Sequence, residues 1–161
     1  FVYAAKKVLE YYPNAIFVVA GGGDMERAII KKVAELGISS KFIFTGFLRG
    51  KEVYAAYKMA DLYVMPSVSE PFGIAPLESL SQGTPVIISK QSGVSEVLTN
   101  CLKVDFWDTD EMANKIVAVL KHDELKRTLQ ENGSKEAYAM TWDKPAERCI
   151  DIYKDLMQRG V

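Results

Sequence analysis

Two glutamates, Glu70 and Glu78, stand eight residues apart on either side of the segment Phe-Gly-Ile-Ala at 72–75. A carboxylate repels phosphate, but it accepts hydrogen bonds well from the vicinal hydroxyls of a sugar. Pro76 has no backbone N–H and is tolerated in the first turn of a helix, so a helix should begin near residues 72–75. The free N–H groups and the positive end of that helix suit a diphosphate. The pattern predicts a site for a ligand that carries both sugar hydroxyls and phosphates.

A second interpretation of the same residues needs no ligand. Glu70 would then end a surface loop, and Glu78 would only complement the positive end of the helix, which begins a few residues before it. For the two carboxylates together, with a helix start between them, the sequence favours the ligand site.

The elements that would position the two glutamates follow from the apolar pattern. The run Leu62–Met65 ends just before the loop that contains Glu70, and a second run, Val86–Ile88, follows a turn at 83–85. The run Ala15–Ala20 is uninterrupted, which is typical of a strand buried on both faces of a parallel sheet. We expect strands at residues 15–20, 41–44, 62–65, 86–88 and 102–104, and helices at about residues 1–11, 24–36, 51–59, 72–82, 94–98, 110–120, 123–139 and 144–157.

Strands that alternate with helices of this length indicate βαβ units and a doubly wound parallel sheet, which is an α/β fold. The last three helices would form a helical C-terminal tail. We find no linker or internal repeat, so residues 1–161 are interpreted as one domain. Ligands of such sheets bind beyond the carboxyl ends of the strands. The loops on that side are expected at residues 21–23, 46–50, 66–73 and 91–95.

Composition narrows the classes of protein and partner. Hydrophobic residues make up 48% and charged residues 25% of the chain, which is typical of a globular protein rather than a disordered or fibrous one. A net charge of −1 with interspersed acids and bases gives no reason to expect a nucleic-acid partner. No apolar run approaches the roughly 20 residues that span a bilayer, so we expect no transmembrane segment.

The cysteines and the single histidine offer no catalytic or metal-binding pattern. Cys101 and Cys149 are far apart, have no histidine neighbours, and are interpreted as reduced, buried thiols of a cytoplasmic protein. His122 stands beside Asp123 between two predicted helices, so we expect an exposed turn residue.

The glycine run Gly21–Gly23 follows a predicted strand and opens a predicted helix, as a dinucleotide-binding fingerprint would. The fingerprint fails, because Glu26 occupies the position of its third glycine and no acidic residue ends the next strand. The run is interpreted as a tight turn that lets a neighbour or a ligand approach the backbone, with Asp24 as the N-cap of the following helix.

The segment Pro66–Glu96 has the pattern PSxxEPFGxxxLExxxxGxPVI, followed by a glycine-containing turn and a glutamate. This pattern resembles the C-terminal domain of retaining glycosyltransferases of the GT-B fold, the glycosyl transferases group 1 family. The resemblance extends to the strand and glycine turn at 17–23, to the strand and loop at 42–46, and to Thr141–Trp142. It covers nearly the whole chain, and its glutamate spacing with Pro-Phe-Gly inside is specific.

The resemblance implies a nucleotide-sugar site. Glu70, the candidate catalytic residue, would contact hydroxyls of the donor sugar, and Glu78 would hold the nucleotide ribose. Such enzymes transfer a sugar with retention from a nucleotide-diphosphate sugar, commonly with help from the leaving phosphate and without a metal or other cofactor. The other residues that it implies at the site are Phe72, Gly73 and Ile74, whose amides would meet the sugar and phosphates, Phe47 and Leu48 beside the base, and Gly22 in the glycine turn.

The resemblance also marks what the family has and this sequence lacks. In the family an arginine and a lysine bind the diphosphate from the first strand of this domain and the start of its first helix. Phe1 already lies inside an amphipathic helical pattern, so we expect an N-terminally truncated domain without that strand, those cations or the N-terminal acceptor-binding domain. Neither Arg49 nor Lys90 clearly replaces the cations. We therefore expect weak donor binding and no turnover by this chain alone.

Three questions stay open at this point. The neighbours of the missing strand either close up, receive a strand from another chain, or flank a strand supplied by upstream residues. A glucan synthase of the glycogen or starch type shares the fold and the chemistry. A glycosyltransferase-like module that binds nucleotide or glycan without catalysis is the alternative from another functional class, and an epimerase-like scaffold has the same architecture but no support in these residues.

Overall fold

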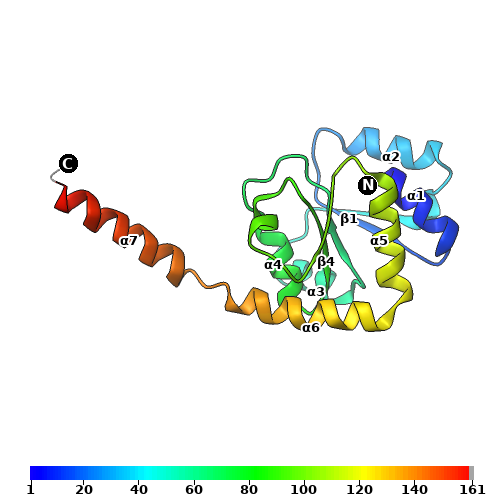
Figure 1. The fold of residues 1–161 in the computed structure, drawn as a ribbon. Helices are drawn as coiled ribbons and strands as arrows, with labels where there is room; N and C mark the ends of the chain where they lie inside the picture. The colour runs from blue at the N-terminus through cyan, green and yellow to red at the C-terminus, as the bar shows by residue number, and fades with distance from the viewer. Residues whose placement is uncertain (160–161) are drawn as a thin grey trace.

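The structure is a computed structural model in which residues 1–159 are described, and it is a mixed α/β fold with parallel strands (Figure 1). The expected α/β class and helical C-terminal tail are confirmed. The strands are β1 (Phe17–Ala20), β2 (Phe42–Gly46), β3 (Tyr63–Met65), β4 (Val86–Ser89) and β5 (Leu102–Val104). The helices are α1 (Val2–Tyr11), α2 (Glu26–Glu35), α3 (Lys51–Met59), α4 (Ile74–Ser81), α5 (Thr109–Lys121), α6 (Asp123–Ala139) and α7 (Asp143–Gln158), with short 3-10 turns η1 (Ser39–Lys41) and η2 (Gly93–Glu96).

The five strands form two parallel sheets instead of one continuous sheet. β1 pairs with β2, and β3, β4 and β5 pair in that order. Within residues 1–159 no ladder joins β1 to β3, so each of these strands has one edge without a strand partner. Of the three possibilities for the gap, closure of its neighbours onto each other is therefore not the one that the structure adopts.

The two sheets nevertheless share one hydrophobic core. Phe17 of β1 and Phe42 of β2 stack with ring centroids 5.1 Å apart, and they belong to the same buried cluster as Ile87 of β4 and Val104 of β5. The helices α1 and α5 pack against each other over this cluster. Its remaining buried members include Ala4, Ala5, Val8, Val33, Met112 and Ile116.

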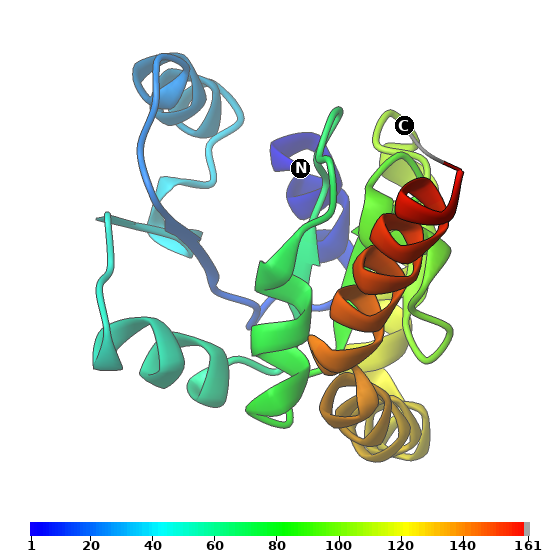
Figure 2. The same ribbon diagram turned by 90° about the vertical axis from the view of Figure 1, so that its left-hand side faces the viewer.

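β4 separates that core from a second cluster on its other face. Ile87 points into the first cluster, whereas Val86 and Ile88 belong to the second, with Leu80 of α4 and Leu98. Successive side chains of a strand alternate between faces, so a strand whose residues are all buried must be covered on both. Figure 2 shows α2 (light blue) and α3 (teal) on one side of the molecule and α6 (yellow to orange) on the other.

The prediction that Ala15–Ala20 is buried on both faces is wrong. Phe17 is buried, but Ile16 and Val18 are exposed, and the neighbouring strand exposes Ile43. The apolar run forms the expected strand, yet only the face that carries Phe17 packs on the core. An apolar sequence permits burial, but a second layer has to cover the strand before it is buried.

Two local predictions also need correction. Asp24 does not cap α2, which begins at Glu26 after Met25 and has no side-chain cap, so the turn after β1 is one to two residues longer than expected. Cys101 is half-buried as a free thiol, but Cys149 is exposed on α7. The predicted stop of α2 at Gly37 is confirmed, since Gly37 has a φ of 68°.

The C-terminal helix α7 has no buried residue and extends away from the packed body of the molecule (Figure 1). Its exposed apolar side chains include Ile150, Ile152, Tyr153, Leu156 and Met157. Among residues 1–159, no helix combines the length and the apolar character that a bilayer crossing requires.

Candidate functional site

The loop that contains Glu70 is held against the loop after β4. The backbone N–H of Gly93 donates to the carbonyl of Glu70 at 3.0 Å, and that of Val94 donates to the carbonyl of Phe72 at 2.7 Å. A parallel bridge pairs Glu70 with Ser92. These bonds continue the pairing of β3 with β4 beyond the strands, so two of the loops expected on the ligand side lie together.

Two glycines make this close approach possible. A Cβ on Gly93 would lie 2.0 Å from the carbonyl oxygen of Pro71, a separation that no side chain tolerates. Gly73 has a φ of 95°, and its Cβ would lie 3.1 Å from Cγ of Glu70 and 3.0 Å from Cε of Met65. Glycine at both positions lets the loop fold over the end of β3 and turn directly into α4.

α4 begins at Ile74, as predicted, with Pro76 in its first turn. Within residues 1–159, the backbone N–H groups of Phe72, Gly73 and Ile74 donate to no other group. The first N–H groups of a helix have no acceptor within the helix, so they are available to other groups. The start of α4 therefore offers consecutive donors at its positive end, beside the side chain of Glu70.

Glu78 lies on α4, half-buried, and its Oε2 accepts a hydrogen bond from the Tyr57 hydroxyl at 3.4 Å. Burial raises the pKa of the Tyr63 hydroxyl, and the negative charges of Glu78 and then Glu70 raise it further. Glu70 lies in the loop that leads into α4, and Glu78 lies about one turn inside that helix.

The remaining predicted residues form a second group at the ends of β1 and β2. The N–H of Gly21 donates to the carbonyl of Gly46 at 2.7 Å, which joins the glycine turn to the loop before α3. A Cβ on Gly22 would lie 3.3 Å from Cε2 of Phe47, so the Phe47 ring covers this turn while its own surface is mostly exposed. Leu48, next to it, is half-buried.

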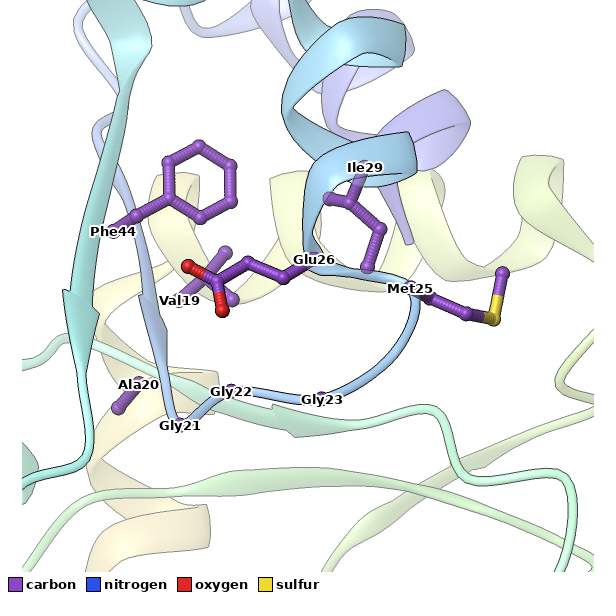
Figure 3. Close-up of a pocket in the computed structure, with 9 residues that line it drawn as sticks. All are labelled: Val19, Ala20, Gly21, Gly22, Gly23, Met25, Glu26, Ile29 and Phe44. Carbon is purple, nitrogen blue, oxygen red and sulfur yellow. The ribbon is translucent and has the colours of Figure 1, made fainter.

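A cavity of about 220 Å³ opens between the glycine turn and α2 (Figure 3). In Figure 3 the Glu26 side chain reaches from the start of α2 toward Phe44. A carboxylate in a mostly apolar lining disfavours phosphate inside this cavity. This agrees with the failed dinucleotide fingerprint. The lining residues are Val19, Ala20, Gly21, Gly22, Gly23, Met25, Glu26, Ile29 and Phe44.

Of the two basic residues considered on the ligand-side loops, Lys90 pairs with an acidic side chain. Lys90 Nζ lies 2.8 Å from Oδ2 of Asp105, and Gln91 donates to Oδ1 of the same carboxylate at 2.8 Å. The bond to Asp105 raises the pKa of Lys90, and the bonds from Lys90 and Gln91 lower the pKa of Asp105. The backbone N–H of Arg49 donates to Glu52 at 3.3 Å. Lys90 is therefore committed to an ion pair.

The prediction for His122 is confirmed, because it is exposed in the turn between α5 and α6. In the part of the chain that the structure describes, His, Cys, Asp and Glu side chains form no cluster of three that would hold a metal ion.

Sequence reasoning missed Tyr57 and Tyr63 as neighbours of the site. Tyr57 lies on α3 and bonds to a carboxylate 21 residues further along the chain, and no periodicity or motif announces such a pair. The sequence indicates Gly93 only indirectly: the loop at 91–95 was expected on the ligand side, but Gly93 itself was not singled out. The contact of that loop with Pro71 is a tertiary one, which depends on the register of β3 with β4.

Comparison with known proteins gives consistent matches. The family model described as "Glycosyl transferases group 1" matches residues 1–136. An uncharacterised glycosyltransferase of Methanocaldococcus jannaschii is 35% identical over 159 residues, which are 96% of this chain and 40% of that protein. The solved structure of sucrose-phosphate synthase from Thermosynechococcus elongatus superposes with a TM-score of 0.81 at 26% identity, over 98% of this chain and 42% of that one.

A further solved structure, Anabaena HepE in complex with UDP-glucose, has a TM-score of 0.71 at 20% identity. It covers 81% of this chain and 39% of its own, and at that identity it supports the fold alone. The chain spans about two fifths of the length of each of these proteins.

Proposed function

This chain belongs to the glycosyl transferases group 1 family, and we propose that it is the donor-binding part of a retaining glycosyltransferase. The donor would be a nucleotide-diphosphate sugar, and the acceptor a glycan, a lipid or a small molecule bound with the help of an N-terminal domain. HepE, which shares the fold, has been solved in complex with UDP-glucose, a donor of this class.

One observation carries the proposal: Glu70 precedes the amino end of α4, Glu78 lies about one turn inside the helix, and between them the N–H groups of Phe72, Gly73 and Ile74 have no partner within residues 1–159. Sugar hydroxyls need acceptors, and phosphates need donors and positive potential. This segment provides both acceptors for sugar hydroxyls and donors for phosphates. A site for phosphate alone would not need the acceptors, and a site for a glycan alone would not need the positive helix end.

In this proposal each residue has a binding role that the geometry supports. Glu70, whose Cγ packs on Gly73, accepts from hydroxyls of the transferred sugar and so orients its reacting carbon. The start of α4 binds the sugar and the diphosphate and stabilises the negative charge that grows on the leaving group. Glu78 accepts from the ribose, and Phe47 and Leu48 lie beside the base.

The proposed reaction needs no cofactor and no protein base. With front-face attack, the acceptor oxygen bonds to the anomeric carbon as the bond from that carbon to the phosphate oxygen breaks. The leaving phosphate takes the proton of the acceptor hydroxyl and departs as part of the nucleoside diphosphate. The contribution of the protein is orientation and charge stabilisation, both of which depend on a rigid site.

A non-catalytic nucleotide-binding module is the second candidate, and the ion pair of Lys90 with Asp105 favours it. A diphosphate at α4 would not receive this cation, and a charge-assisted hydrogen bond contributes about 1.5–3 kcal/mol. We therefore expect weak binding by residues 1–161, in the millimolar range. The two candidates share the donor site and differ only in turnover.

The proposal is tested by titrating the ¹⁵N-labelled chain with UDP-glucose, GDP-mannose and ADP-glucose and following the backbone amide signals. We expect the largest shifts at Phe72, Gly73 and Ile74. Glu78→Ala should weaken binding about tenfold, because it removes acceptors for two hydroxyls.

Glu70→Ala should weaken binding of the nucleotide sugar but not of the free nucleoside diphosphate, which lacks the sugar that Glu70 contacts. Glu131→Ala, an exposed carboxylate on α6, serves as the control and should bind like the unaltered chain. Shifts that map elsewhere, or equal affinities in all three variants, would refute the site assignment.

A further inference from the structure

Tyr57 of α3 reaches across to α4 and touches the proposed ribose-binding carboxylate. Its hydroxyl lies 3.4 Å from Oε2 of Glu78, and the two helices pack against each other. The carboxylate can only accept, so the tyrosine is the donor. At 3.4 Å the bond is longer than the roughly 2.5–3.0 Å that is typical between two oxygens.

The position of Tyr57 is fixed by two contacts that do not involve its hydroxyl. Its ring meets the Tyr63 ring edge-on, with centroids 5.4 Å apart and an interplanar angle of 90°. Its carbonyl accepts a hydrogen bond from Oγ1 of Thr84 at 2.6 Å, and Thr84 is almost fully buried in the turn after α4. Tyr57 is therefore tied to both β3 and α4, the elements that carry the site.

The hydroxyl is a dependable donor. Burial raises its pKa, and the neighbouring Tyr63 and Glu78 raise it further, so it stays protonated through the physiological range. One further tyrosine of the same helix, Tyr54, provides a contrast: its side chain is 48% exposed and makes no hydrogen bond within residues 1–159.

We propose that Tyr57 is a positioning residue, whose hydroxyl holds the Glu78 carboxylate in the orientation that receives the two ribose hydroxyls. This inference rests on the proposed function, which assigns the ribose to Glu78. An ionised carboxylate has about four acceptor sites, so a bond to Tyr57 through Oε2 leaves enough for a vicinal diol. A carboxylate fixed before binding loses less side-chain entropy when the ligand arrives.

The inference is tested by asking whether loss of the Tyr57 hydroxyl weakens binding only of nucleotides that carry ribose hydroxyls. Tyr57→Phe keeps the ring on Tyr63 and removes only the hydroxyl, so the amide spectrum and the melting temperature should change little. Binding of UDP, GDP or ADP, whichever binds the unaltered chain, should weaken about 3- to 10-fold, the range expected for the loss of one ordinary hydrogen bond. The 2′,3′-dideoxy forms of the same nucleotides should bind Tyr57→Phe and the unaltered chain equally.

A double-mutant cycle and a matched control complete the experiment. With Glu78→Ala already present, Tyr57→Phe should have no additional effect, because the two residues act as one unit. Tyr54→Phe should leave all affinities unchanged.

The other possible results contradict either this inference alone or the proposed function as well. If Glu78→Ala weakens binding but Tyr57→Phe does not, or if Tyr57→Phe weakens binding of the dideoxy forms equally, the inference is wrong and the proposed function stands. If no ribonucleotide binds, or Glu78→Ala has no effect, the proposed function and this inference both fall.

Discussion

The two sheets of this molecule are built from similar apolar residues, but they pack differently. Every residue of β4 is buried, with one core against Ile87 and another against Val86 and Ile88. In the sheet of β1 and β2, Val18 and Ile43 are 39% and 51% exposed. One sheet is therefore covered on both faces and the other on one.

The difference matters because Glu70 and Glu78 lie on a loop and a helix that are held against the fully covered sheet. The loop of Glu70 is fixed by backbone bonds from Gly93 and Val94, and α4 packs on β3, β4 and α6. The glycine turn after β1 is joined to β2 by Gly21, but α2 buries only Val33. A site that orients a sugar has to be held within fractions of an ångström, which the doubly covered sheet allows.

The largest change in stability is expected from a pair of isoleucine-to-alanine substitutions, one in each sheet. Ile87→Ala removes a side chain that is completely buried in β4 and should lower the free energy of unfolding by about 2–5 kcal/mol. Ile43→Ala, in β2, removes a half-exposed side chain and should cost less than about 1 kcal/mol. Urea unfolding followed by circular dichroism measures both.

Equal costs for the two substitutions would contradict the comparison, because they would mean that the exposed face of β2 is covered in solution. The urea dependence of the free energy should be the same in both variants, which confirms that the folded and unfolded states compared are the same.

A smaller change in stability is expected from glycine-to-alanine substitutions in the loop after β4 and in the glycine turn after β1. Gly93→Ala places a Cβ 2.0 Å from the Pro71 carbonyl oxygen, so the Glu70 loop must move. We expect a cost of about 1–3 kcal/mol, typical of overpacking, and a loss of nucleotide binding. Gly23→Ala meets no atom within 4 Å and should change stability by no more than about 0.5 kcal/mol.

The same urea titrations and the amide titrations with nucleotide measure this pair. If Gly23→Ala impairs binding more than Gly93→Ala does, the ligand lies on the glycine turn, and the site has been assigned to the wrong sheet.

Particular residues show how far the sequence predicts this structure. Strong local signals placed α3 at Lys51–Met59 and α6 at Asp123–Ala139 within the expected bounds, and Pro76 located the start of α4. Local sequence patterns did not predict the burial or the contacts of residues whose surroundings depend on segments far away in the chain. Val18 is exposed because no layer covers it, and Tyr57 belongs to the site because α3 packs on α4, which the sequence of neither helix reveals.

The smallest predicted effect concerns Glu136, which joins α6 to the segment just before β5. Its carboxylate accepts from the N–H and Oγ1 of Thr99 at 2.9 and 2.7 Å, and from the N–H and Nδ2 of Asn100 at 2.7 and 2.9 Å. Glu136→Gln leaves one acceptor oxygen where there were two. We expect a loss of about 1–2 kcal/mol near neutral pH, measured by urea unfolding.

The pH dependence identifies the cause of that loss. Burial opposes ionisation of Glu136, but the bonds from Asn100 and Thr99 outweigh it and hold its pKa below the ordinary 4.5. A group whose pKa is lower in the folded state stabilises the fold above its unfolded pKa and stops doing so as pH falls through the folded value. The difference in the free energy of unfolding between Glu136→Gln and the unaltered chain should therefore be complete at pH 7 and shrink as the pH falls below 4.5 toward the lowered pKa of the folded state. Glu131→Gln changes an exposed residue of the same helix and should have the same free energy of unfolding as the unaltered chain at both pH values. A difference for Glu136→Gln that persists undiminished in acid would mean that the shape of the side chain, and not its charge, holds α6 in place.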